Sequence, residues 1–389
     1  MLNPNTNQRE LAYVVTIDEI KPIPNYDRVE YARVGGWWVI VRKDQFKVGD
    51  SAIYIEIDSR VPEKEPFMFL EKRKFKVKTL KMCGVVSQGL LMSPEDFGWH
   101  KDDLQTKGFL TKELGITYAD DEDNKRKAAS ADKYKLMAQR RPNIFKKKWA
   151  RWMMRRNWGK KIMFFFFGKK KDKKREWPAW VVKTDEERVQ NCSWLFPENH
   201  KTWVATEKID GTSTTFTMLA KGYKYYVCSR NVVFNKPDKK CYYDTNVYLE
   251  MSEKYNIENI LKGILKDEKE LKFITLQGET YGAGIQKRDY GLKDHQFMAF
   301  NLILGFNNGE IMRFNPLIMR EFLKQYDIPC VPIVTREYRI PKTCDEVIAD
   351  AAGKSAIDGG MREGLVFRTY DGKESFKAVD PEFLMKYHN

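Results

Sequence analysis

Long apolar segments, paired cysteines and histidines are scarce in this chain of 389 residues. The longest purely apolar run has six residues, Ile162–Phe167, whereas a helix needs about 20 to cross a bilayer. The first seven residues lack the basic and then apolar pattern of a secretory signal. We therefore expect a cytoplasmic protein without a membrane span, in a reducing compartment.

The six cysteines and four histidines are scattered along the sequence. No two cysteines have C-x-x-C spacing, and no histidine lies near a cysteine at the spacing of a zinc site. This pattern predicts free thiols and argues against a zinc enzyme. The histidines show no metal-like cluster in the sequence either.

The net charge is +15, and one segment carries all of the excess. Between Lys133 and Arg175 the net charge is +17, so the remaining residues sum to −2. Aromatic residues interrupt the cations at helical spacing, which predicts a short basic amphipathic helix. The segment would clamp an RNA backbone, adhere to an anionic membrane surface or be a solvated insert. The candidate RNA-binding cations in it are Lys146, Lys147, Lys148, Arg151, Arg155 and Arg156.

The sequences on either side of this segment differ in pattern. Residues 10–95 contain short runs rich in β-branched and aromatic residues with turn signals between them, which predicts a small OB-like β-barrel. From Trp177 onward, strand and helix patterns alternate, which predicts an α+β domain built on antiparallel sheet. We expect domains at 1–118 and 177–389, with an acidic linker and a basic aromatic insert at 119–176. Helices are expected at 246–255, 316–326, 344–352 and 381–387.

The segment Thr206–Thr212 places a lysine directly after an apolar strand and before a glycine. Alternate residues of a strand share a face, so Lys208 and Asp210 would lie in one pocket. Gly211 would let the backbone approach a ligand closely. A nucleophilic lysine has to lose its proton, so we expect cations or burial to lower its pKa from about 10.4. Alone, K-x-D-G equally fits an exposed lysine at a strand end.

Three further strand ends carry charged residues. The segment Gln277–Gln286 leads from a strand with Glu279 into a glycine-rich turn, without the helix that a P-loop requires. Glu363 enters an apolar strand at Gly364, and Lys377 lies on a short strand. Taken singly, these patterns fit a hairpin turn and solvated strand ends.

Taken together, the motifs occur in the order K-x-D-G, G-E, F-M-A-F, E-G-L-V and S-F-K. In this order the chain resembles the covalent nucleotidyltransferases, the superfamily of polynucleotide ligases and capping enzymes. It is most similar to the ATP-dependent RNA ligases that carry an N-terminal OB-fold domain, over about 10–118 and 177–389. The segments 183–191 and 229–231 add to the similarity. The resemblance implies an OB-like nucleic-acid-binding domain followed by an α+β, antiparallel-sheet nucleotidyltransferase domain.

The resemblance also implies a role for each matching residue. Lys208 would attack the α-phosphate of ATP and carry AMP as a phosphoramidate, and Lys377 would neutralise that phosphate. Asp210 and Glu363 would hold a hydrated Mg²⁺ or Mn²⁺. The other implied site residues are Glu207 and Phe300 beside the adenine, Arg230 at the ribose or the RNA 5′-phosphate, Glu279 at the ribose or a metal-bound water, Gly211 at the nucleotide and Arg188 at the RNA.

Two features separate the chain from DNA ligases and capping guanylyltransferases. Those relatives usually have arginine where this chain has Ser213, and they continue into a C-terminal OB domain, whereas 12 residues follow Lys377 here. Many relatives also have a K-x-K motif at the last lysine. Here one lysine suffices, or Lys386 supplies the second cation.

We therefore expect a monomeric ATP-dependent RNA ligase that joins 3′-hydroxyl and 5′-phosphate ends at nicks in duplexes, through lysyl-AMP and 5′-adenylated RNA. The alternatives are a DNA ligase or capping enzyme of the same superfamily, and a non-catalytic basic RNA-binding protein with a degenerate transferase domain.

Overall fold

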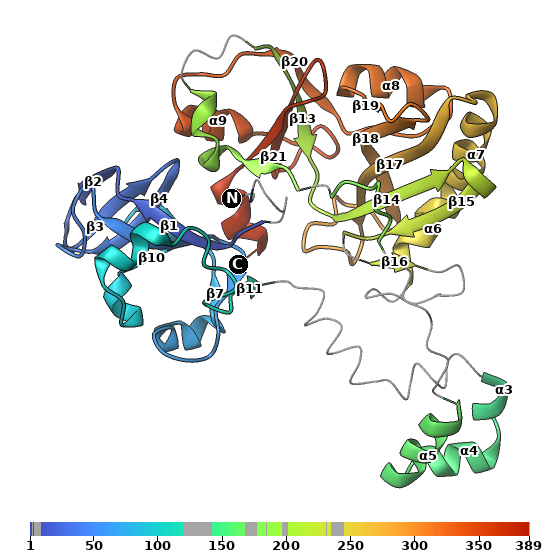
Figure 1. Ribbon diagram of the computed structural model, residues 1–389, viewed down its shortest axis with the longest axis horizontal. Coiled ribbons are helices and arrows are strands. Elements are labelled where there is room, and N and C mark those ends of the chain that lie inside the picture. Colours follow the sequence, from blue (N-terminus) through green and yellow to red (C-terminus); the bar gives the residue numbers. More distant parts are fainter. Residues whose placement is uncertain are drawn as a thin grey trace.

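The computed structural model describes residues 1, 3, 9–119, 142–167, 177–183, 185–196, 201–230, 232–234 and 245–388. Residues 120–132 of the linker expected at 119–132, and the lysine-rich run at 169–175, lie outside the described residues. The described part contains a small β-rich region, a short helical segment and a larger region of sheets and helices (Figure 1).

Residues 9–119 form the small β-rich region, drawn in blue to cyan in Figure 1. Its sheets have the strand orders β1–β5–β10, β2–β3–β4 and β11–β6–β7, and β8 and β9 form a hairpin. All of these strand pairs are antiparallel. The strands are β1 (Ala12–Thr16), β2 (Glu19–Ile23), β3 (Tyr26–Val34), β4 (Trp37–Arg42), β5 (Ser51–Ile55), β6 (Ser59–Arg60), β7 (Lys76–Val77), β8 (Thr79–Met82), β9 (Val85–Gln88), β10 (Leu90–Met92) and β11 (Thr117–Tyr118).

The larger region contains two sheets. The six-stranded sheet has the order β16–β15–β14–β17–β18–β19, and the five-stranded sheet has the order β12–β22–β21–β13–β20. Only the β12–β22 pair among these described strands is parallel. The strands are β12 (Glu187–Arg188), β13 (Trp203–Lys208), β14 (Thr212–Leu219), β15 (Lys224–Cys228), β16 (Val233–Phe234), β17 (Leu271–Gly282), β18 (His295–Phe306), β19 (Ile311–Arg313), β20 (Ile333–Tyr338), β21 (Gly364–Thr369) and β22 (Ser375–Val379).

Helices cover both sheets, which makes this region an α+β structure as the sequence predicts. The helices are α6 (Val247–Lys254), α7 (Ile257–Asp267), α8 (Pro316–Lys324), α9 (Cys344–Ala351) and α10 (Pro381–Phe383), which continues into a π-helical turn, η7 (Leu384–His388). Helix α7 was not among the expected helices, although its buried residues Ile257, Leu261, Ile264 and Leu265 have helical spacing.

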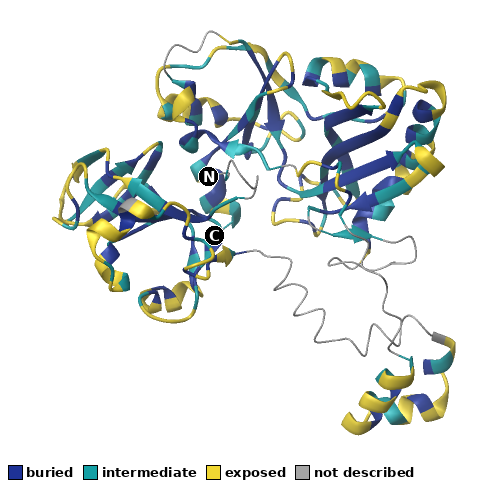
Figure 2. Cartoon of the chain, in the orientation of Figure 1, coloured by how far each residue is buried: buried dark blue, intermediate teal, exposed yellow. Residues whose placement is uncertain are grey.

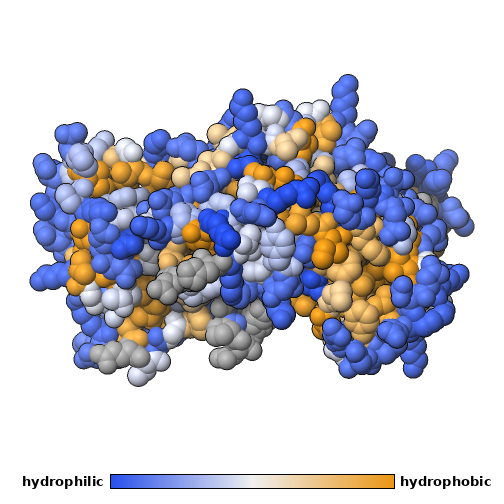
Figure 3. Space-filling model, turned by 90° about the horizontal axis from the view of Figure 1, so that it is seen from above, coloured by the Kyte–Doolittle hydropathy of each residue, from blue (hydrophilic) through white to orange (hydrophobic). Residues whose placement is uncertain are grey.

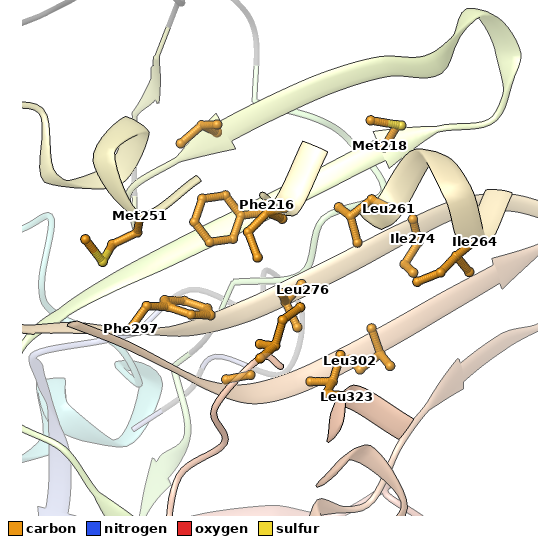
Figure 4. Packing of buried hydrophobic residues seen from close by; sticks show 14 of the residues in the cluster. Phe216, Met218, Met251, Leu261, Ile264, Ile274, Leu276, Phe297, Leu302 and Leu323 are labelled. Atoms are coloured by element: carbon orange, nitrogen blue, oxygen red, sulfur yellow. The ribbon is translucent and has the colours of Figure 1, made fainter. Parts of the chain in front are cut away.

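The main hydrophobic core lies between the six-stranded sheet and helices α6, α7 and α8 (Figure 4). Phe216 of β14 and Phe297 of β18 meet edge to face at 5.3 Å, and both are fully buried. Figure 2 shows the central strands of this sheet buried and the outer surfaces of the helices exposed. Because strand residues alternate, the opposite face of the sheet is free to carry polar side chains such as Gln277 and Glu279.

Side-chain caps fix the starts of two helices. Asn315 accepts hydrogen bonds from the backbone N–H groups of Leu317 and Ile318, and Pro316 occupies the first position of α8. Thr343 and Glu346 form a capping box at α9. Both helices begin where the sequence predicts and end one or two residues earlier.

The basic segment folds differently from the expected single amphipathic helix. It forms three short helices, α3 (Pro142–Phe145), α4 (Lys148–Met154) and α5 (Asn157–Phe167). Phe145, Ala150 and Met163 form a small core. Trp149 and Trp152, which the helical pattern placed on the apolar face, are both 49% exposed because three short helices enclose too little volume to bury them.

The small β-rich region packs against the larger one. The backbone N–H of Gly36 donates to the carbonyl of Gln190 at 2.9 Å, and Arg188 forms an ion pair with Asp58 at 2.9 Å. Val379 and Leu384, from the end of the chain, lie in a core cluster with Trp37 and Tyr54 of the small region. The C-terminal tail therefore completes the hydrophobic core of the N-terminal region.

Figure 3 shows one face of the molecule, on which hydrophilic residues surround scattered apolar patches. Among the described residues, no helix has the length and apolar character needed to cross a membrane.

Substitutions at two aliphatic residues of α8 would test the packing of the main core. Leu323 is 1% exposed in the main core and Ile318 is 55% exposed on the same helix. We expect Leu323→Ala to lower the free energy of unfolding by about 2–5 kcal/mol, because it removes buried methyl groups and leaves a cavity. Ile318→Ala, as the matched control, should change it by less than about 0.5 kcal/mol. Urea denaturation followed by circular dichroism measures both. Equal effects would contradict the packing described.

Candidate active site

Lys208 is the last residue of β13 and lies opposite Gly364, the first residue of β21. The neighbouring residue, Glu363, is 5% exposed and accepts a hydrogen bond from Lys208 Nζ at 2.8 Å. Two motifs that are 155 residues apart in the sequence thus form one ion pair. The pairing of β13 with β21 is what brings them together.

Asp210 follows two residues after Lys208, and its carboxylate lies near the same ion pair. It is 4% exposed, and its Oδ1 lies 3.1 Å from His388 Nε2. Its backbone N–H donates to the Tyr290 hydroxyl at 2.7 Å. One ligand atom each from Asp210, Glu363 and His388 lie within 4.8 Å of one another. His388 shows no metal-like spacing in the sequence, and it joins this group because the fold brings the end of the chain back to the site.

Glu279 lies on β17, opposite Ser213 of β14, and extends the acidic group. Burial, together with the charges of Glu363 and Asp210, raises the pKa of Glu279 to about 8 even though Lys208 opposes the shift. Burial likewise raises the pKa of Glu363. The site therefore holds more carboxyl groups than it can ionise without further positive charge.

The pKa of Lys208 is shifted in the direction opposite to the expected one. Burial by itself would lower it, but the charges of Glu363, Glu279 and Asp210 outweigh burial and raise it. In this structure Lys208 is protonated and forms an ion pair with Glu363. Carboxyl groups surround it, whereas the sequence argument expected cations or desolvation to lower its pKa.

The close approach of β17 explains why residue 211 is a glycine. A Cβ atom at this position would lie 2.4 Å from the carbonyl oxygen of Thr280 and 2.9 Å from Glu279 Cγ. The glycine thus permits the close approach of β17, where the sequence argument expected the approach of a ligand. It sets Glu279 beside the residues that follow β13.

Lys377 lies on β22, paired with Val366 on one side and with Arg188 of β12 on the other. Burial, reinforced by the positive charges of Arg9, Arg188 and Lys208, lowers the pKa of Lys377 to about 7. An anion placed here would stabilise its charged form. Lys386 lies on the exposed side of the C-terminal tail.

Phe300 lies at a β-bulge of β18. Gln277 pairs with Asn301 and Gly278 pairs with Ala299, so Phe300 is the extra residue. Phe300 packs on an apolar cluster that contains Ile209, the residue after Lys208. An apolar surface therefore borders the lysine, in a place suited to a flat ring.

The Glu207 side chain is buried and accepts hydrogen bonds from two donors. Its oxygens accept hydrogen bonds from the Ser355 hydroxyl and, at 2.8 Å, from the Ala356 N–H. Its role beside an adenine stays a prediction.

Two arginines of the expected RNA site lie in different surroundings. Arg230 pairs with Asp185, and its guanidinium lies 5.0 Å from the ring centre of Tyr118 in the small region. Arg188 is 5% exposed and pairs with Asp58, so it lies in the contact between the two regions, where the sequence argument expected an RNA-binding surface. The cations of the α3–α5 segment expected to bind RNA are all exposed: Lys146, Lys147, Lys148, Arg151, Arg155 and Arg156.

Sequence reasoning missed His388, Tyr290 and Asp185. The first two had no local signal, since their contacts with Asp210 depend on the tertiary fold. Asp185 lies within the 183–191 segment that supported the resemblance, but its partner Arg230 was not foreseen.

The residues present fit a divalent cation. Asp210 Oδ2 is buried and has no hydrogen-bond partner, which is costly unless another group satisfies it. Carboxylate oxygens are the ligands that Mg²⁺ and Mn²⁺ take in proteins. Asp210 and Glu363 would hold such an ion, with Glu279 nearby.

Comparisons with known proteins agree with this arrangement. Residues 11–94 match a family model described as an OB-fold domain, and residues 201–388 match the RNA ligase family model. Residues 201–388 are thus similar to the RNA ligase family over most of the larger region. The N-terminal region is therefore the expected OB-fold domain, and the region with Lys208 is the ligase domain.

Solved structures of an RNA ligase from Naegleria gruberi share this fold. The structure with PPi has 24% identity and a TM-score of 0.72, covering 97% of this chain and 99% of that one. Structures of two variants, one with ATP and Mn and one with AMP and Mn, have the same identity and TM-score and cover 97% and 98% of this chain and 99% of theirs. Comparison with curated protein sequences gives no match.

Lys377 offers a test of the electrostatics of the ligase domain. Its pKa is about 7 in the fold and about 10.4 in an unfolded chain, so the unfolded state binds more protons between these values and stability rises with pH across them. We expect Lys377→Met to raise the free energy of unfolding at pH 7 by about 1–2 kcal/mol. The gain should shrink toward pH 10.

Lys373→Met is the matched control, because Lys373 lies on the same hairpin and its side chain is 81% exposed. Its effect should be near zero at either pH. Chemical denaturation at pH 7 and pH 9 measures both variants, and a loss of stability in Lys377→Met at pH 7 would contradict the buried-cation description.

Proposed function

We propose that this protein is an ATP-dependent RNA ligase that seals 3′-hydroxyl and 5′-phosphate ends, at nicks in duplexes. The single observation that carries the proposal is the ion pair between Lys208 and Glu363, with Asp210, Glu279 and Lys377 around it. This set combines a nucleophile, carboxylates for a cation and a cation for a phosphate. The match of residues 201–388 to the RNA ligase family model supports RNA as the class of substrate.

In the first step, Lys208 Nζ forms a bond to the α-phosphorus of ATP, the bond to the β-phosphate oxygen breaks, and pyrophosphate leaves. Lys208 must be neutral to attack. A divalent cation held by Glu363 would deprive Lys208 of the partner that most raises its pKa. Lys377, which an anionic phosphate would keep protonated, stabilises the charge that develops on the α-phosphate.

A divalent cation held by Asp210 and Glu363, with Glu279 through a bound water, would neutralise phosphate charge. Phe300 would stack on the adenine, beside Ile209. Glu207 would border the adenine through the loop that it anchors at Ser355.

In the second step, AMP passes from Lys208 to the RNA 5′-phosphate, and in the third the RNA 3′-hydroxyl displaces AMP. Arg230 would contact the ribose or the incoming 5′-phosphate, which requires its release from Asp185. Arg188 is buried in its ion pair with Asp58, so it would support Lys377 on the paired strand from within the contact between the domains.

We also propose the division into residues 1–118, 119–176 and 177–389, and a monomer. The described cysteines Cys83, Cys192, Cys330 and Cys344 are free thiols, which supports the proposal of a reducing, cytoplasmic compartment.

The adenylation step tests the proposal. Incubation of the protein with α-labelled ATP and Mg²⁺ or Mn²⁺ should yield a labelled band that acid releases. Lys208→Ala should abolish the band, because it removes the nucleophile. Lys221→Ala, an exposed lysine of the same domain, should leave it unchanged. A band of full intensity in Lys208→Ala would refute the assignment of Lys208, and labelling by GTP alone would indicate a capping enzyme.

The acceptor is a separate question. We expect the adenylated protein to seal a nick with RNA on both sides faster than the same nick built from DNA. Equal or faster sealing of the DNA nick would move the protein to the DNA ligases.

We propose further that the α3–α5 segment binds the RNA backbone. Residues 142–167 contain eight Lys or Arg and no acidic residue. Trp149, Trp152 and Trp158 are about half exposed among these cations, and Arg156 lies 4.0 Å from the ring centre of Trp152. Cations that neutralise phosphates together with rings that stack on bases are typical of single-strand binding.

Deletion of residues 133–175 should weaken RNA binding and reduce the dependence of log K on log salt, because fewer counterions are released. Fluorescence anisotropy between about 50 and 200 mM salt measures both quantities. The deleted protein should still form the adenylate, which shows that it is folded. Unchanged affinity and slope would exclude the clamp, and binding of the intact protein to anionic vesicles but not to RNA would favour a membrane surface.

A further inference from the structure

The C-terminal tail places an imidazole nitrogen inside the acidic site. His388 Nε2 lies 3.1 Å from Asp210 Oδ1, and both lie within 4.8 Å of a carboxylate oxygen of Glu363. His388 is 28% exposed and Asp210 is 4% exposed, so the contact is largely shielded from water. The other oxygen of Asp210 is buried without a partner.

Both domains hold the tail in position. At its start, the N–H of Asp380 donates to the carbonyl of Glu363 at 2.9 Å. In the middle, Leu384 packs into the core of the OB-fold domain. At its end, Lys78 Nζ of the OB-fold domain donates to the carbonyl of His388 at 2.9 Å. The imidazole is therefore carried by a fixed segment, as a metal ligand has to be.

The distance between the imidazole and Asp210 is compatible with two neighbouring ligands of one cation. Ligand atoms bound at about 2.1 Å in octahedral geometry lie about 3.0 Å from their neighbours in the shell. The 3.1 Å between His388 Nε2 and Asp210 Oδ1 matches this edge. His388 Nε2 and Asp210 Oδ1 thus fit adjacent positions of one shell, and Glu363, which lies within 4.8 Å of both, would supply a third ligand on turning from Lys208.

We propose that His388 is a direct nitrogen ligand of the divalent cation held by Asp210 and Glu363. This inference rests on the metal site of the proposed function and adds a residue to it. Mg²⁺ is a hard ion that takes oxygen ligands, whereas affinity for nitrogen rises from Mn²⁺ onward along the transition series. The site therefore prefers Mn²⁺ to Mg²⁺, and His388 is the residue that gives it this preference.

Pulsed EPR of the Mn²⁺-loaded, full-length protein tests the ligand directly. The sample contains Mn²⁺ and α,β-methylene ATP, whose bridging carbon prevents adenylation of Lys208. Histidines labelled with ¹⁵N distinguish imidazole from the lysine amine. We expect ¹⁵N coupling in the wild type and none in His388→Gln, whose amide keeps a hydrogen-bond donor toward Asp210.

Mn²⁺ affinity, read from the EPR signal of free Mn²⁺, gives the second measurement. We expect His388→Gln to weaken Mn²⁺ binding by about tenfold or more. Mg²⁺ affinity, from competition with Mn²⁺, should change much less. Glu382→Gln is the matched control, since Glu382 lies on the same tail and its side chain is 54% exposed in an ion pair with Lys81. It should leave coupling and affinity unchanged.

Two results would overturn the inference. Absence of ¹⁵N coupling in the wild type with bound Mn²⁺ would make His388 a counter-ion of Asp210 and not a ligand. Coupling that persists in His388→Gln would assign the nitrogen to another histidine. Both results leave the labelling of Lys208 by ATP untouched, so failure of this inference is distinguishable from failure of the proposed ligase activity.

Discussion

The ion pair between Lys208 and Glu363 determines the chemistry of the rest of the site. It joins the end of β13 to the start of β21, and it places one cation among the carboxyl groups of Glu363, Asp210 and Glu279. Because that cation cannot balance three buried carboxyls, the pKa of Glu279 rises to about 8. These carboxyl groups suit the binding of a metal ion. Binding of the ion to Glu363 would break its ion pair with Lys208 and leave the lysine available for attack.

The OB-fold domain and the ligase domain share structure at this site. Val379 and Leu384 from the C-terminal tail lie in the core of the OB-fold domain, and the same tail ends on Asp210. Arg188 links β12, next to Lys377, to Asp58 of the OB-fold domain. Movement of one domain relative to the other would therefore act directly on Asp210 and on Lys377, to which we assign roles in the reaction.

The sequence predicted the parts of the site that depend on local pattern. Lys208 ends β13, Glu363 directly precedes β21 and Glu279 lies within β17, and strand pairing brings the three together. The pKa shift of Lys208 and the position of His388 were beyond such reasoning, because both depend on which distant segments pack together. The bulge at Phe300 has no signature in the residue pattern either, since it exists only as a register shift between β17 and β18.

The helix predictions that were confirmed differ from the one that was wrong in how far the apolar face is buried. Helices α8 and α9 could be predicted because the capping residue and the first residues of the apolar face are close together in the sequence. The segment of Trp149 was read as a single helix because periodicity alone cannot tell whether an apolar stripe has a partner large enough to bury it.

Mapping the adenylated residue tests the central claim most directly. The wild-type protein, labelled with ATP and digested at alkaline pH to preserve a phosphoramidate, should carry AMP on a single peptide, with the adduct on Lys208. Label on Lys377 or on any other residue would contradict the account, which proposes Lys208 as the nucleophile and Lys377 as the cation that binds the phosphate.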